Sequence, residues 1–424
     1  MKNVLVIGSG GREHTFAWKL SKDENVDKVF CIPGNGGTAK IAINHNIDIK
    51  DFNEIYSYVL DQDIDMIIVG PEAPLNDGIV DFFREKNVKI FGPDKFASQL
   101  ECSKLFARDF MLENKIPQPE YFECDRVSKA IEIKDKVGLP LVLKADGLAA
   151  GKGVLICKSE SEYHEGIKTM LEDKKFGSAS DKISIEECLE GEEVSVFAVC
   201  DGQNYKIIGN AQDHKRAFDG DSGPNTGGMG AYSPTLLCDE KFLEKVEDRI
   251  IKPTLKGMSE IGHPFTGFLY VGLMIVNNEP YVIEFNVRMG DPETQVVIPR
   301  IKTSLYEIFN NCLEETLKDT DIEFESDWYC TVVLASKGYP EKYTKGQEIK
   351  GLEKVREGSL FHAGSKKTDD NYFVSGGRVL NVIGNGEDLS SAIDNAYKNI
   401  ENIEFENMYY RTDIGHKGLI KEKS

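Results

Sequence analysis

Blocks of apolar residues alternate with amphipathic segments along the first hundred positions of the chain. Short apolar runs predict strands, and the segment after the first run has the spacing of a helix that buries one face. Gly and Pro cluster directly after these strands. The predicted strands cover residues 3–7, 28–32, 64–69 and 88–91, and the predicted helix covers residues 13–21. This order predicts a doubly wound, parallel α/β domain whose ligands lie at the carboxyl ends of its strands.

The pattern changes beyond residue 101, where longer strands are mixed with helices. A predicted helix at 103–114 leads to a small unit of strands and helices, and the chain ends in an α+β pattern. Further strands are predicted at 265–276, 281–285, 329–335 and 377–383, and further helices at 240–261 and 388–403. We therefore expect an α/β and α+β multidomain protein. The expected domains are residues 1–101, 102–192, 193–325 and 326–424.

Composition narrows the class of protein. The 424 residues are 40% hydrophobic, and a net charge of −20 disfavours general binding to nucleic acid. No apolar run is long enough to span a membrane, and the N-terminus lacks the apolar core of a signal peptide. The nine cysteines contain no Cys-x-x-Cys pair. We therefore expect a cytoplasmic enzyme with reduced thiols, which holds anionic substrates by local clusters of cations.

A glycine-rich loop, called the flap below, predicts a phosphate site. Lys144 ends an apolar strand, and Gly147, Gly151 and Gly153 allow the following backbone to fold closely over an anion. Lys152 adds positive charge, and a second apolar strand follows. The flap lacks the Ser or Thr and the helix that belong to a Walker A loop. A glycine-rich hairpin with solvated lysines is the alternative interpretation.

A second glycine-rich loop, Gly-Ser-Gly-Gly-Arg-Glu at residues 8–13, follows the first strand and opens the first helix. This position invites a dinucleotide-binding interpretation. However, Glu13 replaces the third glycine, and the second strand ends at Pro33 without the acid that would hold an adenosine ribose. The loop still offers backbone N–H groups and a helix N-terminus to a phosphate. We expect a phosphorylated small molecule here, and a purely structural turn is the alternative.

An acidic run at residues 185–193 joins two predicted strands after the flap. A charged, solvated hairpin is the ordinary interpretation of such a run. Its position after the flap favours a second interpretation, because such a connection can present backbone groups to an adenine edge and a carboxylate to a ribose.

Glu284 and Asn286 lie two residues apart on a predicted strand, so their side chains point to the same face, and Arg288 lies near them. Two oxygen ligands on one face suit Mg²⁺, which takes few protein ligands and completes its shell with phosphates and water. The residues between them are apolar, and a buried carboxylate needs a partner. An exposed polar strand face is the alternative to this metal site.

Together these motifs resemble those of the phosphoribosylamine–glycine ligases, also called glycinamide ribonucleotide synthetases, in the ATP-grasp superfamily. The resembling segments span the whole chain in the same order: residues 9–14, 33–38, 70–75, 144–153, 213–216, 225–231, 284–295 and 410–415. The resemblance implies an N-terminal doubly wound substrate-binding domain. It also implies an ATP-grasp lid with the flap at 102–192, an ATP-grasp catalytic domain with the metal site at 193–325, and a small C-terminal α+β domain.

The resemblance implies a ligase of de novo purine biosynthesis that joins glycine to 5-phosphoribosylamine. ATP would be a substrate, and Mg²⁺ or Mn²⁺ would assist. Transfer of the γ-phosphoryl group to the glycine carboxylate would give glycyl phosphate, which the ribosylamine nitrogen then attacks. The products would be N1-(5-phospho-D-ribosyl)glycinamide, ADP and phosphate. Phosphoryl transfer needs charge neutralisation and alignment, which agrees with a site of lysines, a glycine-rich flap and a metal.

The same resemblance assigns roles to individual residues. Lys144, Asp213 and Arg288 would be catalytic, with Asp213 facing the glycine amine and Arg288 its carboxylate, and Glu284 and Asn286 would hold the metal. ATP would be bound by Lys104, Lys144, Gly151, Lys152, Gly153, Glu186, Leu189 and Glu193. Within that set, Glu186 and Leu189 would meet the adenine and Glu193 the ribose. Substrates would be bound by Gly10, Gly11, Arg12, Glu13, Gly34, Asn35, Gly36, Glu72, Asp213, Lys215 and Arg288.

The implied partners are the small molecules glycine and phosphoribosylamine, without nucleic acid or membrane, and transient contacts with neighbouring purine-pathway enzymes. Two other functions fit parts of the pattern. One is a different ATP-grasp ligase, such as a biotin carboxylase or a carboxyaminoimidazole ribonucleotide synthase, which the loops at 33–38 and 213–216 disfavour. The other is a non-catalytic nucleotide sensor, which the complete set of Lys144, Glu284, Asn286 and Arg288 disfavours.

Overall fold

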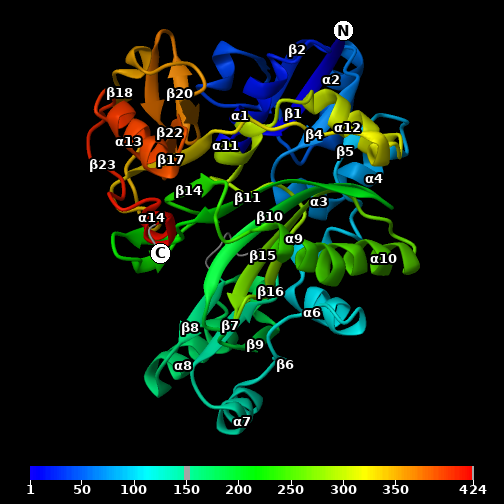
Figure 1. Cartoon of the computed structure of the whole chain (residues 1–424), viewed down its shortest axis with the longest axis vertical. Helices are drawn as coiled ribbons and strands as arrows, with labels where there is room; N and C mark the ends of the chain where they lie inside the picture. The colour runs from blue at the N-terminus through cyan, green and yellow to red at the C-terminus, as the bar shows by residue number, and fades with distance from the viewer. Residues whose placement is uncertain (148–152, 423–424) are drawn as a thin grey trace.

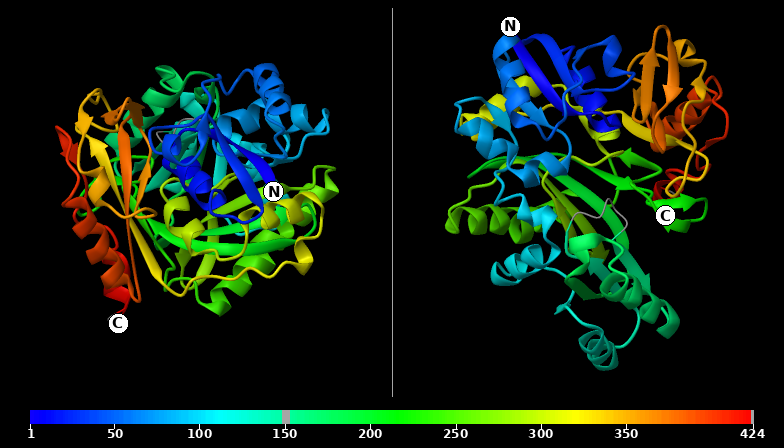
Figure 2. Two further views of the ribbon diagram at one scale, coloured as in Figure 1. Left: turned by 90° about the horizontal axis from the view of Figure 1, so that it is seen from above. Right: turned by 180° about the vertical axis from the view of Figure 1, so that it is seen from behind.

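The structure is a computed structural model that describes residues 1–147 and 153–422 (Figure 1). The N-terminal domain and the C-terminal part of the chain lie side by side at one end of the molecule, and a small lid lies at the other end (Figure 1; Figure 2). Long antiparallel strands run between them. No helix in the described part of the chain is long and apolar enough to cross a bilayer.

Parallel strands form the sheet of the N-terminal domain, in the order β3-β2-β1-β4-β5. The apolar run in β1, from Val4 to Ile7, is fully buried because elements pack against both faces of the sheet. The strands are β1 (Lys2–Gly8), β2 (Val26–Pro33), β3 (Ile43–Asn44), β4 (Met66–Val69) and β5 (Ile90–Phe91). The helices are α1 (Gly11–Leu20), α2 (Phe52–Asp61), α3 (Glu72–Asp77), α4 (Ile79–Arg84) and α5 (Gln99–Cys102). The predicted parallel α/β domain is confirmed.

The lid is an antiparallel sheet in the order β6-β9-β7-β8. As predicted, the flap lies between two strands. Lys144 near the end of β7 pairs with Val154 at the start of β8, so the structure shows that these strands are antiparallel neighbours. Residues 148–152 of the flap lie outside the described part of the chain. The elements are α6 (Lys104–Glu113), β6 (Tyr121–Cys124), α7 (Val127–Val137), β7 (Leu141–Ala145), β8 (Val154–Cys157), α8 (Glu160–Ile167) and β9 (Ile183–Glu187).

One antiparallel sheet runs from the middle of the molecule into its C-terminal part, in the order β16-β15-β10-β11-β14-β17-β22-β19, with β23 beside β17. Its central strands are β10 (Glu192–Asp201), β11 (Tyr205–Asp213), β14 (Gly230–Ser233), β15 (Thr266–Val276) and β16 (Glu279–Asn286). Its C-terminal strands are β17 (Trp328–Ser336), β19 (Leu360–His362), β22 (Arg378–Gly386) and β23 (Met408–Tyr409). Residues on both sides of the proposed boundary at 325/326 thus share one sheet.

Smaller elements surround this sheet. The single helix predicted at 240–261 consists of α9 (Glu240–Val246), a π-helical turn at Glu247–Ile251 and α10 (Lys252–Glu260). The remaining strands are β12 (Arg216–Phe218), β13 (Ser222–Asn225), β18 (Glu348–Ile349), β20 (Ser365–Thr368) and β21 (Asn371–Val374). The remaining helices are α9 (Glu240–Val246), α10 (Lys252–Glu260), α11 (Thr294–Val297), α12 (Leu305–Leu313), α13 (Leu389–Ile400) and α14 (His416–Glu422).

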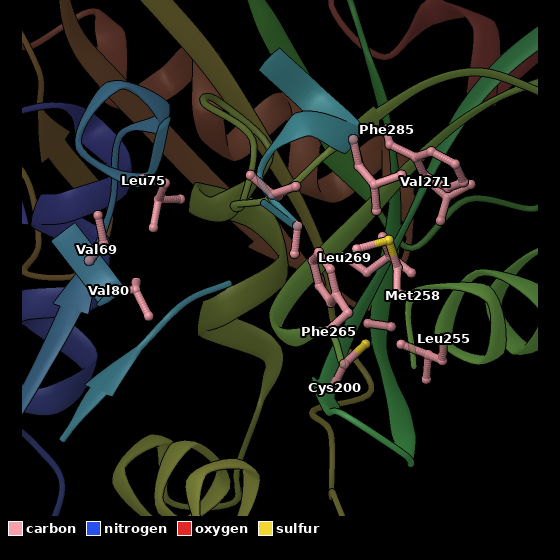
Figure 3. Packing of buried hydrophobic residues seen from close by; sticks show 14 of the residues in the cluster. Val69, Leu75, Val80, Cys200, Leu255, Met258, Phe265, Leu269, Val271 and Phe285 are labelled. Carbon is pink, nitrogen blue, oxygen red and sulfur yellow. The ribbon is translucent and has the colours of Figure 1, made fainter. Parts of the chain in front are cut away.

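One hydrophobic cluster joins the N-terminal domain to the central sheet. Figure 3 shows side chains from the two sides of this cluster: Val69, Leu75 and Val80 of the N-terminal domain, and Leu255, Met258, Phe265, Leu269 and Val271 of the central part. A second cluster centres on Phe268 of β15. The ring centroid of Phe268 lies 5.5 Å from that of Phe16, 4.9 Å from that of Phe91 and 5.5 Å from that of Phe309. These clusters fix the N-terminal domain on the strands that carry the site.

We expect Phe268→Ala to lower the free energy of unfolding by about 3–5 kcal/mol, because it removes a ring that is 3% exposed and leaves a cavity between α1, β5 and α12. Urea unfolding monitored by circular dichroism checks the change. Leu112→Ala is the control, since Leu112 is 64% exposed, and it should change stability by no more than about 0.5 kcal/mol. Equal effects of the two substitutions would contradict the proposed role of Phe268.

Candidate active site

A cleft of about 1400 Å³ lies between the N-terminal domain, the lid and the long sheet. Its wall also includes Tyr339, Tyr343 and Arg378 from the C-terminal part. The predicted site residues that line the cleft are Gly10, Arg12, Glu13, Glu72, Lys104, Lys144, Gly153, Glu186, Leu189, Glu193, Asp213, Lys215, Glu284, Asn286 and Arg288. The fold therefore brings together residues that are separated by up to 278 positions in the sequence, from Gly10 to Arg288.

The lining does not include the predicted substrate residues Gly11, Gly34, Asn35 and Gly36. The predicted ATP residues Gly151 and Lys152 lie outside the described residues. The roles of these six residues, like the roles of those that line the cleft, stay predictions.

Asn35 joins the N-terminal domain to the C-terminal part. Its Nδ2 donates to the carbonyl oxygens of Ser9 at 2.9 Å and His362 at 2.8 Å, and its Oδ1 accepts from the N–H of Gly37 at 2.8 Å. The N–H of Gly36 donates to the carbonyl oxygen of Ser365 at 3.0 Å. The loop at 33–38 thus holds two parts of the molecule together beside the cleft.

Glu13 shapes the loop at residues 8–13. Its Oε2 accepts from the N–H of Gly10 at 2.5 Å, and its Oε1 pairs with Nε of Arg12 at 2.5 Å, so the side chain caps its own helix. A Cβ at Gly8, which has φ +126°, or at Gly70 would lie within about 2.5 Å of Glu13 side-chain atoms. The absence of side chains at Gly8 and Gly70 therefore leaves space for the Glu13 side chain. Glu13, at the position of the third glycine of a dinucleotide motif, caps the helix and pairs with Arg12.

Three lysines surround Glu284: Lys104 of α6, Lys144 of β7 and Lys215 from the connection between β11 and β12. Nζ of Lys104 and Nζ of Lys215 each lie 3.9 Å from a Glu284 oxygen, and Lys144 is close enough to add to their effect. Although burial opposes it, Lys215, Lys104 and Lys144 lower the pKa of Glu284 to about 2. The carboxylate is thus ionised at any physiological pH. The lysines lie farther from it than in a close ion pair, so a bound polyanion could also interact with their charge.

Glu186 is buried, with 1% of its surface exposed, and its carboxylate is fully engaged. Its Oε2 lies 2.8 Å from Nζ of Lys144 and 2.6 Å from Nη2 of Arg108. Lys144 and Arg108 lower the pKa of Glu186 to about 2 against the effect of burial, and burial lowers the pKa of Lys144 to about 8. The side chain of Glu186 is therefore not free to meet a nucleobase.

Lys215 lies among carboxylates from neighbouring strands. Its Nζ is 2.9 Å from Oε2 of Glu193. Although burial opposes it, Glu193, Asp213 and Glu284 raise the pKa of Lys215 well above its usual value. Burial raises the pKa of Asp213 to about 7, and Glu293 adds to this shift. The end of β11 therefore carries a carboxyl group that is poised to bind a cation.

Arg288 is held by two acids. Its Nη2 donates to Oε1 of Glu101 at 2.7 Å, and Oε2 of Glu72 lies 3.4 Å from its Nε. Among the described residues, this buried Nε has no hydrogen-bond partner. The guanidinium is thus fixed in orientation and retains one N–H for an incoming oxygen.

Glu284 and Asn286 of β16 both line the cleft, as the two-residue spacing predicts. Within residues 1–147 and 153–422, no group of three or more His, Cys, Asp or Glu side chains could hold a metal ion. An ionised carboxylate next to an amide oxygen, without a complete protein cage, fits Mg²⁺ or Mn²⁺ that arrives with phosphates.

The sequence analysis missed several residues of the cleft. Glu101 orients Arg288, and Glu293 accepts from the hydroxyl of Tyr270 at 3.0 Å while it is 5% exposed. Arg378 of β22 donates to the carbonyl oxygens of Gly227, at 2.8 Å, and Asp291. Gly227, Asp291 and Glu293 lie within the recognised motifs at 225–231 and 284–295, whereas Glu101, Tyr270 and Arg378 lie outside every motif and left no local signal.

Comparisons with known proteins agree over the whole chain. The phosphoribosylglycinamide synthetase family matches in three consecutive parts: its N domain at residues 2–101, its ATP-grasp (A) domain at 102–294 and its C domain at 329–417. A phosphoribosylamine–glycine ligase of Clostridium acetobutylicum is 45% identical over 412 residues, which cover 97% of this chain and 99% of that protein.

Solved structures agree in fold. The crystal structure of phosphoribosylamine–glycine ligase from Thermotoga maritima has a TM-score of 0.82 at 34% identity and covers 97% of this chain and 99% of that one. The biotin carboxylase domain of a 2-oxoglutarate carboxylase from Hydrogenobacter thermophilus has a TM-score of 0.72 at 17% identity, with 96% and 91% covered. At that identity the second match shows a shared fold alone.

We expect the free energy of unfolding of Asp213→Asn, relative to that of the wild type, to increase as the pH rises. The folded protein keeps Asp213 protonated up to about pH 7, whereas the unfolded chain releases this proton near pH 3.8. The folded state therefore binds more protons in this window, so wild-type stability falls with rising pH and levels above pH 7. The stability difference should change by roughly 1–3 kcal/mol between pH 5 and 7. Urea unfolding at pH 5, 6, 7 and 8 measures it, and a constant difference would contradict the shift.

Proposed function

This chain belongs to the phosphoribosylamine–glycine ligase family of ATP-grasp enzymes, and we propose that its cleft joins glycine to 5-phosphoribosylamine in a reaction driven by ATP. The products would be N1-(5-phospho-D-ribosyl)glycinamide, ADP and phosphate, in de novo purine biosynthesis. One observation carries the proposal: three lysines from separate parts of the chain meet around Glu284 in the cleft that also contains Asp213 and Arg288.

The chemistry explains why such a cleft is suitable. A carboxylate is a poor electrophile, so one glycine oxygen first attacks the γ-phosphorus of ATP, and ADP leaves. The amine of phosphoribosylamine then attacks the carbonyl carbon of glycyl phosphate, and phosphate leaves with the oxygen that came from glycine. Neither step needs a protein nucleophile, whereas both concentrate negative charge that the lysines would neutralise.

Glycine would lie between Asp213 and Arg288. The pKa of Asp213 is raised to about 7 by burial, so a bound ammonium group would favour its ionised form. The Nε of Arg288, which makes no hydrogen bond, would donate to the glycine carboxylate, and Glu72 and Glu101 would keep the guanidinium in place. One carboxylate oxygen would remain for the γ-phosphoryl group.

ATP would lie against the lid. Leu189 and the main chain near Glu186 would contact the adenine, and Glu193 would accept from the ribose hydroxyls. Lys104 and Lys144 would bind the phosphates, together with the flap residues predicted from the sequence. The Glu186 carboxylate would act on Lys144 rather than on the base.

Phosphoribosylamine would lie at the carboxyl ends of β1 and β4, where an α/β sheet binds its ligands. Gly10 is the N-cap residue of α1, and the N-terminus of a helix favours a phosphate. Arg12 adds a cation, and its Nη1 donates to the carbonyl oxygen of Met289 at 3.0 Å. Arg12 therefore touches the loop beyond Arg288, so the two substrates would meet there.

Glu284 and Asn286 would hold Mg²⁺ or Mn²⁺, which would supply charge neutralisation at the β- and γ-phosphates. We also include in the proposal a cytoplasmic location and transient contacts with neighbouring purine-pathway enzymes.

The function is tested by ADP release from the purified protein with ATP and Mg²⁺. Release should require both glycine and freshly made phosphoribosylamine, and omission of either should abolish it. Glycine labelled with ¹⁸O in its carboxylate should yield one labelled oxygen in the inorganic phosphate, as mass spectrometry would measure, because that oxygen leaves with the phosphoryl group. If the label stays entirely in the amide product, the acyl-phosphate mechanism is wrong.

Glu284→Gln should raise the Mg²⁺ concentration for half-maximal rate at least about 10-fold, because it keeps the shape but removes the charged ligand. Steady-state rates over a Mg²⁺ titration measure this. Glu279→Gln is the matched control on the same strand: Glu279 pairs with Lys245 at 2.6 Å outside the cleft lining, and its loss should change the requirement by less than about 2-fold. Full wild-type activity in excess chelator would contradict the metal site.

A further inference from the structure

Arg108 of α6 is a buried arginine to which no sequence motif assigns a function. Only 2% of the surface of Arg108 is exposed, and Arg108 lies one helical turn beyond Lys104. Its Nε donates to Oε1 of Glu186 at 2.9 Å, and its Nη2 donates to Oε2 of Glu186 at 2.6 Å. The pair is therefore bidentate, which is the geometry of strong arginine–carboxylate interactions.

The same guanidinium also binds strand β16. Its Nη1 donates to the carbonyl oxygen of Val282 at 2.9 Å, and its Nη2 donates to that of Ile283 at 2.8 Å. Ile283 directly precedes Glu284. Arg108 thus connects α6, β9 and β16, and each of these elements carries a residue proposed for the ATP site.

Lys144 and Arg108 share two acceptors. Nζ of Lys144 lies 2.8 Å from Oε2 of Glu186 and 2.8 Å from the carbonyl oxygen of Ile283. Two cations therefore meet one carboxylate, and the group of three side chains has a net charge of +1. Without Arg108, Lys144 and Glu186 would form a neutral pair, and little charge would remain for an anion.

We propose that Arg108 is a positioning residue that occupies Glu186 and fixes Ile283, so that the Lys144 ammonium stays in place with its charge available to the nucleotide phosphates. This role rests on the proposed function, in which Lys144 binds ATP. Arg108 itself need not touch the nucleotide, because its guanidinium donors are used by Glu186 and the strand carbonyls.

Calorimetric titration with ADP and with adenosine, both in Mg²⁺ buffer, tests the proposal in the full chain. Arg108→Gln should weaken ADP binding at least about 10-fold and change adenosine binding by less than about 2-fold, since adenosine has no phosphate. A general loss of structure would weaken both ligands. Arg300→Gln is the control, because Arg300 is partly buried, donates to the carbonyl oxygen of Asp327 and lies outside the cleft lining.

A double-mutant cycle shows whether Arg108 acts through Lys144. In a Lys144→Met background, Arg108→Gln should change ADP affinity by less than about 2-fold, because the residue it serves is gone. The double variant Arg108→Gln/Glu186→Gln removes one positive and one negative charge, so the net charge stays the same. It should recover part of the ADP affinity lost in Arg108→Gln, because Lys144 then has no counter-ion. This variant also avoids an unpaired buried carboxylate that could prevent folding.

Additive effects of Arg108→Gln and Lys144→Met, or an equal loss of ADP and adenosine binding, would overturn the positioning role. Unchanged ADP affinity in Arg108→Gln alone would do the same while the proposed function stands. If Lys144→Met also leaves ADP affinity unchanged, the assignment of Lys144 to the phosphates fails, and the role of Arg108 fails with it.

Discussion

The buried carboxylate of Glu186 sets the main constraint on the side of the cleft formed by the lid. Burying a charge is costly unless partners surround it, and removing one partner of such a group costs about 3–5 kcal/mol. Arg108 and Lys144 are those partners, and they come from α6 and β7. The sheet of the lid, its helix α6 and strand β16 must therefore keep their relative positions, which also defines the wall of the cleft.

A protein with a net charge of −20 must bind a polyanion, and the cleft resolves this conflict by local pairing. Its cations are held by acids at different distances. Arg288 is tightly fixed by Glu101 at 2.7 Å, whereas Lys104 lies 3.9 Å from Glu284. Close pairs fix orientation, and loose pairs leave charge that an incoming phosphate can use, because Coulomb attraction weakens with distance.

The C-terminal part contributes to the site although its sequence pattern only suggests a separate α+β unit. Strand β17 extends the central sheet, and Arg378 of β22 binds the loops at Gly227 and Asp291. Asn35 connects the N-terminal domain to His362. The C-terminal part therefore holds two loops of the cleft and the neighbouring domain, and these contacts are visible only in the tertiary structure.

The sequence by itself determined those features that depend on local periodicity. Apolar runs of parallel strands, the two strands beside the flap and the shared face of Glu284 and Asn286 follow from spacing along the chain. Tertiary structure alone decided that Glu186 binds Arg108 and that Glu101 orients Arg288, since the partners lie 78 and 187 positions apart. The sequence shows which residues are close along the chain. The partners of a buried charge depend on distances in space and on the exclusion of water, and both exist only after folding.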